Sequence, residues 1–276
     1  MKNVMKLFIC LLVLVVTVTF VGCGKKNTLN DVKEKGKIVI STSPDYAPWE
    51  FIDSSKSGQE QYVGADVEFM KYIAEKLGVE LEIKATDFDT TLALLQTGAV
   101  DLAISGFTYK AERAENYEMS DPYDGEGSQG VLVLTENVET YKDLESLNVA
   151  GIKVAGQNGS LQADYVAQYL PNAEVKKVTK ISDGILYLNS GEVKALAISS
   201  TAAESIIAQN PGKYTYLEDT FPVPEEETQL FVLAQKGQTE LIAEVNKIIK
   251  EVLEKGLYKE WMEEATELAE KTGDLE

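Results

Sequence analysis

Leu95-Gln-Thr-Gly-Ala-Val-Asp-Leu-Ala-Ile-Ser105 is matched further along the chain by Leu188-Asn-Ser-Gly-Glu-Val-Lys-Ala-Leu-Ala-Ile-Ser199, which has one extra residue. Each copy has the pattern of a helix end, a glycine stop, a buried strand and a serine-rich corner. Turns of this composition also recur by chance. If the repeat is real, the chain contains two similar units, and the two corners are counterpart strand ends that face each other across a cleft.

Strands and helices alternate around both copies. In the first unit we expect strands at 37–42 and 79–84 and helices at 67–77 and 90–96. In the second we expect strands at 152–155, 173–178 and 195–198 and helices at 160–170, 182–189 and 202–209. This βαβ rhythm predicts two α/β units with largely parallel, buried sheets. The tail, residues 239–272, predicts two amphipathic helices broken near Gly256.

Residues 1–22 have the pattern of a signal peptide, with a basic start, a short apolar run and Gly22 before Cys23. The run is too short for a membrane span, which needs about 20 apolar residues. Phe20-Val-Gly-Cys23 is similar to a lipoprotein box, so we expect Cys23 to be lipidated and residues 23–28 to form a tether at the outer face of the cytoplasmic membrane. The alternative is cleavage by ordinary signal peptidase, with Cys23 incidental.

The chain is strongly acidic and contains no histidine. Its formal charge of −19 falls to −21 when Lys2 and Lys6 leave with the signal peptide. This charge argues against a nucleic-acid partner, which would need clusters of Lys and Arg. The lack of histidine removes the commonest metal ligand and general base. We therefore expect no metal, no cofactor and no nucleic acid.

The first copy ends in Ser105-Gly-Phe-Thr108, and a single arginine, Arg113, follows. Ligands of open α/β sheets bind at the carboxyl ends of strands. Arginine presents a planar fork of donors that matches the two oxygens of a carboxylate. The corner therefore suits a small carboxylate. The alternative is an ordinary turn with a solvated arginine.

Three other segments offer candidate contacts. The loop Ser43-Pro-Asp-Tyr-Ala-Pro-Trp-Glu-Phe51 follows a strand; we expect Tyr46 to face a ligand and Trp49 to be a core anchor. Phe88 lies between a strand and a helix, although on its own this segment is only a helix start. Gln157-Asn-Gly-Ser160 enters a helix, whose unpaired backbone N–H groups favour an anion.

Taken together, these segments resemble the extracellular solute-binding proteins of amino-acid ABC transporters, a family with the type II periplasmic-binding fold. The resemblance runs from Leu29 to about Trp261, and the order and spacing of its motifs carry it. The motifs are Tyr46-Ala-Pro-Trp-Glu-Phe51, Val63-Gly-Ala-Asp66, Asp87-Phe88, Gly98-Ala-Val-Asp101, Gly106-Phe-Thr108, Glu112-Arg113, Ser120-Asp-Pro-Tyr123, Gly159-Ser160 and Gly256-Leu-Tyr258.

The resemblance implies two Rossmann-like α/β lobes joined by a two-stranded hinge, with the ligand in the cleft between them. Lobe 1 would comprise residues 29–131 and 228–276, and lobe 2 residues 132–227. The chain would cross between the lobes near Val131–Leu134 and near Glu225–Phe231.

The resemblance also implies roles for individual residues. Arg113 would hold the carboxylate of a small zwitterionic solute, with help from Thr108 and the Ser160 corner. The Gly106 carbonyl and the Thr108 hydroxyl would accept hydrogen bonds from its ammonium group. The candidate ligand-binding residues are Ser43, Tyr46, Phe88, Ser105, Gly106, Thr108, Arg113, Gln157, Ser160 and Ser199, with Gln162 near the far end of the ligand.

One position departs from this family. After the strand 195–198 the family usually has an aspartate that pairs with the ligand's ammonium, whereas this chain has Ser199-Ser-Thr201. Serine brings no charge, and a buried cation without a partner is costly. Either the ligand is not a free α-amino acid, or another carboxylate supplies the charge. The conceivable sources are Asp45, Glu126, Glu226 and Glu227.

The resemblance implies a monomeric substrate-binding component of an ABC importer. It would capture a polar amino acid or close derivative, close around it by hinge motion and deliver it to a membrane permease. One alternative is an enzyme similar to cyclohexadienyl dehydratase, with Glu126 or Glu112 as its acid; another is a ligand sensor without transport. Lack of histidine argues against the enzyme. Ser43 disfavours Arg or Lys as the ligand, whereas Gln157 and Gln162 suit a polar or amide side chain.

Overall fold

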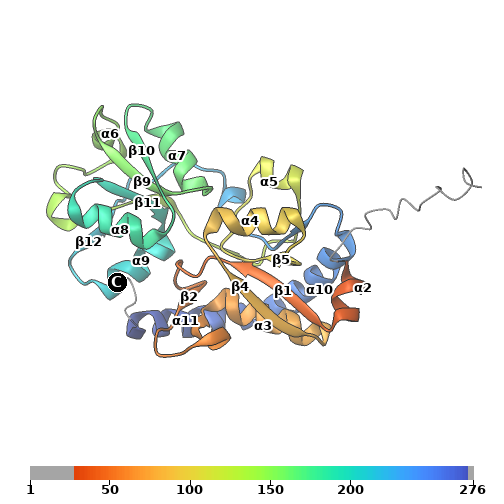
Figure 1. Cartoon of the computed structure of the whole chain (residues 1–276). Helices are drawn as coiled ribbons and strands as arrows, with labels where there is room; N and C mark the ends of the chain where they lie inside the picture. Colours follow the sequence, from red (N-terminus) through yellow and green to blue (C-terminus); the bar gives the residue numbers. More distant parts are fainter. Residues whose placement is uncertain (1–27, 273–276) are drawn as a thin grey trace, which may run out of the picture.

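The computed structural model describes residues 28–272, which form two α/β lobes, each built on a five-stranded sheet (Figure 1). The strand order is β4-β1-β5-β14-β6 in one lobe and β10-β9-β11-β8-β12 in the other. The expectation of a two-lobed α/β protein is confirmed. The predicted signal peptide, Cys23 and most of the predicted tether lie outside the described residues.

The first lobe contains α2 Leu29–Lys35, β1 Lys37–Thr42, β2 Phe51–Ile52, β3 Tyr62–Val63, α3 Ala65–Leu77, β4 Glu80–Ala85, α4 Phe88–Thr97, β5 Leu102–Ala103, α5 Ala111–Asn116, β6 Tyr117–Met119, β14 Leu233–Gln235, α10 Thr239–Lys255 and α11 Leu257–Thr272. The second contains β8 Gln129–Leu134, α6 Leu144–Leu147, β9 Lys153–Gln157, α7 Leu161–Tyr169, β10 Glu174–Val178, α8 Ile181–Ser190, β11 Ala195–Ser199, α9 Ser200–Gln209 and β12 Tyr214–Tyr216. Short 3₁₀ turns lie at Gly58–Gln61, Thr135–Asn137 and Glu225–Thr228.

The two sheets have the same topology, which supports an internal repeat. In each, the second strand in the order, β1 or β9, pairs in parallel with both neighbours, and the fourth strand runs antiparallel to the strands beside it. The reversed strands, β14 and β8, are those that enter each lobe after the chain has crossed from the other. The prediction of largely parallel sheets therefore holds, except for these two strands.

The repeated sequence occupies the same place in both lobes. Its glycines, Gly98 and Gly191, end α4 and α8 in the left-handed conformation, with φ of 71° and 74°. This conformation is easy only for glycine, so the helix stops there and the chain turns into β5 or β11. Both strands are buried.

Two antiparallel strands, β7 (Asp124–Gly125) and β13 (Gln229–Leu230), link the lobes. The first crossing therefore precedes residue 129, earlier in the chain than the segment 131–134 that we expected. Residues 131–134 belong instead to β8, because their apolar side chains are buried in the second sheet. The second crossing lies within the expected range 225–231.

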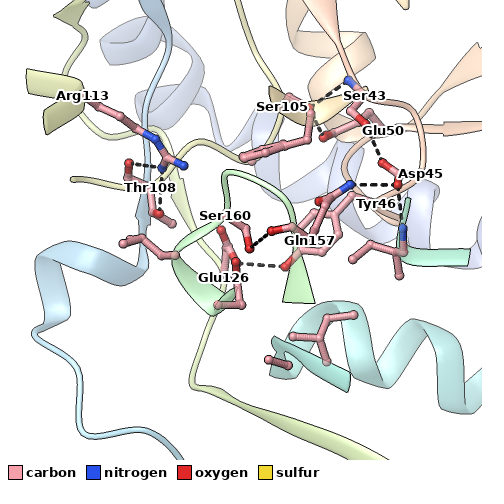
Figure 2. Close-up of a pocket in the computed structure, with 17 residues that line it drawn as sticks. Ser43, Asp45, Tyr46, Glu50, Ser105, Thr108, Arg113, Glu126, Gln157 and Ser160 are labelled. Atoms are coloured by element: carbon pink, nitrogen blue, oxygen red, sulfur yellow. Dashed lines mark hydrogen bonds between the residues drawn. The ribbon is translucent and has the colours of Figure 1, made fainter. Parts of the chain in front are cut away.

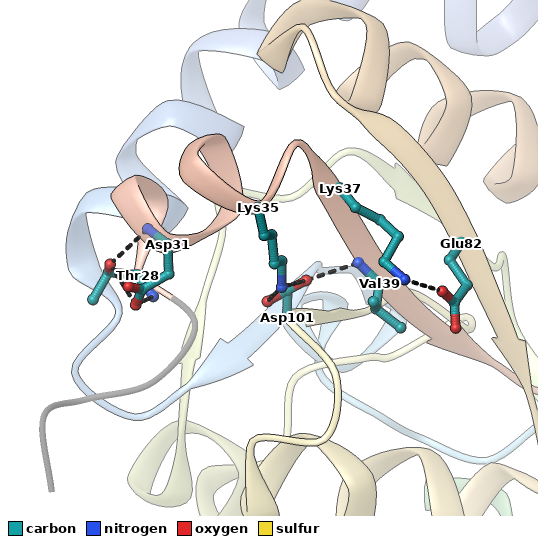
Figure 3. Close-up of polar contacts among 7 residues, drawn as sticks. All are labelled: Thr28, Asp31, Lys35, Lys37, Val39, Glu82 and Asp101. Atoms are coloured by element: carbon teal, nitrogen blue, oxygen red, sulfur yellow. Dashed lines mark hydrogen bonds and ion pairs between the residues drawn. The ribbon is translucent and has the colours of Figure 1, made fainter.

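The buried side chain of Asp101 connects the first helix and strand of the first lobe with β5, the strand that leads to the serine corner, residues 105–108 (Figure 3). Its carboxylate accepts a hydrogen bond from Val39 N at 2.7 Å and forms an ion pair with Lys35 at 2.6 Å. Helix α2 carries Lys35 and begins with a capping box between Thr28 and Asp31. These contacts hold α2, β1 and the approach to β5 together.

The two C-terminal helices complete the first lobe, and α11 also contacts the second. Helices α10 and α11 are separated at Gly256, as predicted. Two of the three buried residues of α11, Ala265 and Ala269, belong to an apolar cluster that also contains Ala202 and Ile206 of α9. Helix α11 packs against α9 of the other lobe (Figure 1). One apolar cluster therefore extends through both lobes.

No helix within residues 28–272 is both long enough and apolar enough to span a membrane. The strands β6, β12 and β14, each three residues long, were not predicted. Such short segments contain too few residues for an alternating pattern to show.

Candidate functional site

A narrow cavity lies between the lobes and is lined by residues of both (Figure 2). From the first lobe and the crossing come Ser43, Asp45, Tyr46, Glu50, Phe88, Ser105, Gly106, Thr108, Arg113 and Glu126. From the second come Gln157, Ser160, Leu161, Gln162, Ile181, Ala197 and Ile198.

The guanidinium of Arg113 is held in place from several sides. Arg113 lies on α5 and is 3 % exposed. Its Nη1 donates to the Thr108 carbonyl at 2.9 Å, and its Nη2 donates to the Gly159 carbonyl of the other lobe at 3.0 Å. The rings of Phe88 and Phe107 lie 5.7 and 5.4 Å from the guanidinium carbon. Burial lowers its pKa to about 10, so the group stays charged at neutral pH.

Carboxyl groups support the serine corner from behind. Ser105 Oγ donates to Glu50 at 2.8 Å and accepts a hydrogen bond from Ser43 N at 2.9 Å. Gly106 has a φ of 55°, and its N–H donates to Asp66. A Cβ at Gly106 would meet the Tyr46 ring at 3.3 Å, so glycine both permits this turn and leaves room for the ring.

Asp66 ties this corner to the core of the lobe. Besides Gly106 N, its carboxylate accepts hydrogen bonds from Tyr123 Oη at 2.9 Å and from Tyr258 Oη at 2.6 Å. Tyr258 lies on α11, at the far end of the chain from the corner. The C-terminal helix therefore helps to position the Ser105–Gly106 turn.

Tyr46 connects the first lobe with two polar side chains across the cavity. Its ring stacks on Trp49, with centroids 5.0 Å apart and planes at 17°. Its hydroxyl lies 2.7 Å from Ser199 Oγ and donates to Glu126 at 3.0 Å. Trp49 is fully buried, as expected of a core anchor.

The second lobe presents the start of α7 to the cavity. Gln157 ends β9, and Ser160 is the N-cap of α7, where its Oγ accepts a hydrogen bond from Ala163 N and donates to the Gln157 carbonyl at 2.8 Å. Gly159, between them, turns the chain with a φ of 82°. The free N–H groups at this helix start favour a negatively charged ligand group.

Direct contacts hold the lobes together on both sides of the cavity. The Asp45 carboxylate accepts hydrogen bonds from Ile181 N at 2.9 Å and from Gln157 Nε2 at 3.0 Å, both in the other lobe. On the rim, Lys110 pairs with Asp164 at 2.7 Å. The lobes are therefore closed on each other in this structure.

All the candidate residues except Ser199 line the cavity. Ser199 is fully buried, caps α9 and touches the site through Tyr46. The roles that the resemblance implies for these residues remain predictions.

Sequence reasoning missed Glu50 and the apolar wall residues Leu161, Ile181, Ala197 and Ile198, because side chains of these types are also typical of ordinary core or surface positions. Residues 28–272 contain no group of three or more side chains suited to bind a metal ion.

Several carboxyl groups of the site hold their protons unusually tightly. Burial raises the pKa of Glu126 to about 7 and that of Asp66 to about 6. Burial, together with the neighbouring Asp66, raises the pKa of Glu50 well above its usual value, and burial also raises that of Asp45. A carboxylate that loses water without gaining a cation favours its neutral form.

These shifts predict that the protein loses stability as the pH rises from about 4.5 to about 7. The folded state then retains protons that the unfolded chain releases, so the free energy of unfolding falls with pH and levels off above the raised pKa values. Glu126 alone, with a pKa raised from 4.5 to about 7, contributes about 3 kcal/mol. Thermal unfolding between pH 5 and 8 will measure this slope. Glu126→Gln should flatten it; an equal slope in that variant would contradict the assignment.

The family model of the bacterial extracellular solute-binding proteins, family 3, matches residues 38–266. The arginine-binding extracellular protein ArtP of Bacillus subtilis is 30 % identical over 264 residues, which cover 93 % of this chain and 98 % of that protein.

Solved structures show the same fold. An amino acid ABC transporter substrate-binding protein of Streptococcus pneumoniae, bound to L-arginine, has a TM-score of 0.80 and 33 % identity, covering 87 % of this chain and 97 % of that one. The ancestral amino acid-binding protein AncCDT-1, a precursor of cyclohexadienyl dehydratase, has a TM-score of 0.75 and 28 % identity, covering 86 % and 98 %.

Proposed function

Because this chain belongs to the bacterial extracellular solute-binding proteins of family 3, we propose that it is the solute-binding component of an ABC importer for a polar amino acid or a close derivative. The similar proteins from Bacillus subtilis and Streptococcus pneumoniae are an arginine-binding protein and a transporter protein bound to L-arginine. Arginine is therefore the first ligand to test here, although Ser43 had disfavoured a cationic side chain.

The buried Arg113 carries this proposal. Its guanidinium lines the cavity together with Thr108, near the start of α7. A buried cation in a small, closed site binds a carboxylate through charge-assisted hydrogen bonds, which are about twice as strong as neutral ones. On this basis Arg113 holds the solute's carboxylate, and the aromatic rings of Tyr46 and Phe88 flank its side chain.

Hinge motion about β7 and β13 would open and close the site. Lobe 1 would then comprise residues 29–128 and 228–272 and lobe 2 residues 129–227, because β8, which begins at Gln129, belongs to the second sheet. The protein acts as an exported monomer, tethered through a lipid on Cys23 to the outer face of the membrane, where it meets its permease. Palmitate labelling of wild type and of Cys23→Ser tests the tether.

Thermal-shift screening of the purified protein against the amino acids tests the function. At a ligand concentration 100 times Kd, binding adds about 2.7 kcal/mol to the free energy of unfolding. For a protein of this size the melting temperature then rises by roughly 5–10 °C. We expect this rise for one or a few polar amino acids, with L-arginine, L-glutamine, L-histidine and L-cystine tested first. No rise with any amino acid would refute the function.

The chain binds its solute without converting it. Glu112, one of the two acids considered for catalysis, is exposed and does not line the cavity. Glu126 does line it, so the enzymatic alternative is tested directly by incubating the protein with cyclohexadienyl carboxylates and following the products. Turnover would favour an enzyme. A permease gene next to this one would favour transport over sensing alone.

A further inference from the structure

The structure separates the four acids that could replace the missing aspartate. Glu226 is exposed on the turn before β13, and Glu227 accepts a hydrogen bond from Tyr165 outside the cavity lining. Asp45 lines the cavity but is already bound to the backbone of α8 in the other lobe. Glu126 is the remaining candidate.

Glu126 is fixed between the two lobes. It directly follows β7, and its backbone N–H donates to the Thr228 carbonyl of the other crossing at 2.9 Å. Its side chain is 1 % exposed and lines the cavity. The backbone of Glu126 is therefore tied to both segments that connect the lobes.

Among the residues that the structure describes, the hydrogen-bond donors to this carboxylate are neutral. Its Oε2 accepts hydrogen bonds from Tyr46 Oη at 3.0 Å, Gln129 Nε2 at 3.3 Å and Gln162 Nε2 at 3.2 Å. None of the ion pairs within residues 28–272 includes Glu126. The raised pKa of Glu126 shows that burial disfavours the charged form of this carboxylate. A cation that enters the cavity would stabilise that charged form.

The arrangement of charges matches a zwitterion. Arg113 and Glu126 line the same cavity and attract each other electrostatically without forming an ion pair. Figure 2 shows both on the side of the pocket opposite Asp45, with Thr108 and Ser160 near them. A ligand that carries a carboxylate and an ammonium group on one carbon can therefore satisfy both charges together.

We propose that Glu126 is the counterion of the solute's α-ammonium group. This inference rests on the proposed function and specifies its ligand as a free α-amino acid. Ser199 supports this arrangement, because its hydrogen bond to the Tyr46 hydroxyl holds that group beside Glu126.

Calorimetry on the full chain, purified in detergent, tests this inference. The probes are the amino acid that stabilises the wild type most and its analogue in which hydrogen replaces the α-amino group. We expect wild type to bind the amino acid at least about 30-fold more tightly than the analogue, as for loss of one partner of a buried charge pair. Glu126→Gln should bind the amino acid at least about 30-fold more weakly than wild type does. Its preference for the amino acid over the analogue should fall to within about threefold.

The controls separate recognition from folding. Glu226→Gln changes an exposed acid in the same crossing region and should bind as wild type does. Glu126→Asp keeps the charge and should retain part of the preference. A general loss of structure would weaken both probes equally, and that result, or an undiminished preference in Glu126→Gln, overturns the inference while the transport function stands. If wild type binds no amino acid, the proposed function fails and this inference fails with it.

Discussion

Arg113→Ala is expected to weaken binding of the solute by about 2–5 kcal/mol, roughly 30- to several thousand-fold in Kd. The guanidinium is buried in the cavity wall, so its loss leaves the ligand carboxylate without a charged partner at a site shielded from bulk solvent. Titration calorimetry with the amino acid that wild type binds will measure the loss. Binding within about tenfold of wild type would mean that Arg113 does not hold the carboxylate.

Two variants sharpen this experiment. Arg113→Lys keeps the charge but loses the planar fork, so it should recover only part of the affinity. Lys110→Ala removes a nearby lysine whose ion pairs with Asp164 and Glu112 lie on the exposed rim, and should cost less than about 1 kcal/mol. The melting temperature of ligand-free Arg113→Ala should change little, because burying this guanidinium is itself costly. Loss of binding then reports on recognition rather than on folding.

Asp66→Ala is expected to lower the free energy of unfolding by about 3–5 kcal/mol. The substitution removes the acceptor for three buried donors, namely Gly106 N, Tyr123 Oη and Tyr258 Oη, and each unpaired buried group costs about 1–3 kcal/mol. Part of the loss is recovered because the buried carboxylate is itself unfavourable at neutral pH. Urea unfolding followed by circular dichroism at pH 7.5 measures the change.

A matched control comes from the same helix. Glu68→Ala removes an exposed ion pair with Lys71 on α3 and should change stability by about 0.5 kcal/mol or less. Tyr258→Phe removes one of the three donors, the Tyr258 hydroxyl, and leaves the other two paired with Asp66. It should therefore lower the free energy of unfolding by only about 1–2 kcal/mol. If Asp66→Ala were no more harmful than Glu68→Ala, Asp66 would not support the serine corner.

Much of the architecture could be predicted because its signals are local. Gly98 and Gly191 stop two helices at equivalent places, and the amphipathic pattern of residues 239–272 gives both C-terminal helices nearly to the residue. The hinge was placed too late, since the apolar run 131–134 gives no sign that the chain has already crossed. The position of the hinge depends on the pairing of β7 with β13, which lie about 100 residues apart in the sequence.

The site was predictable at strand ends and unpredictable where it depends on tertiary packing. Arg113 and Ser160 stand in recognisable local motifs, and both line the cavity. Glu126 could not be singled out among four acids, because its burial follows from the path of the hinge. Glu50 was overlooked for a similar reason, since only the packing of the first lobe places its carboxyl beneath Ser105.

The contact between α11 and α9 has a consequence for how the molecule melts. Two lobes joined only by a pair of short strands would each have an independent core and could unfold at separate temperatures. Here the C-terminal helix carries one lobe's apolar cluster into the other, so neither lobe can lose its packing without exposing surface of its neighbour. Calorimetry should therefore record a single cooperative transition, with equal calorimetric and van't Hoff enthalpies, for a protein whose outline suggests two domains.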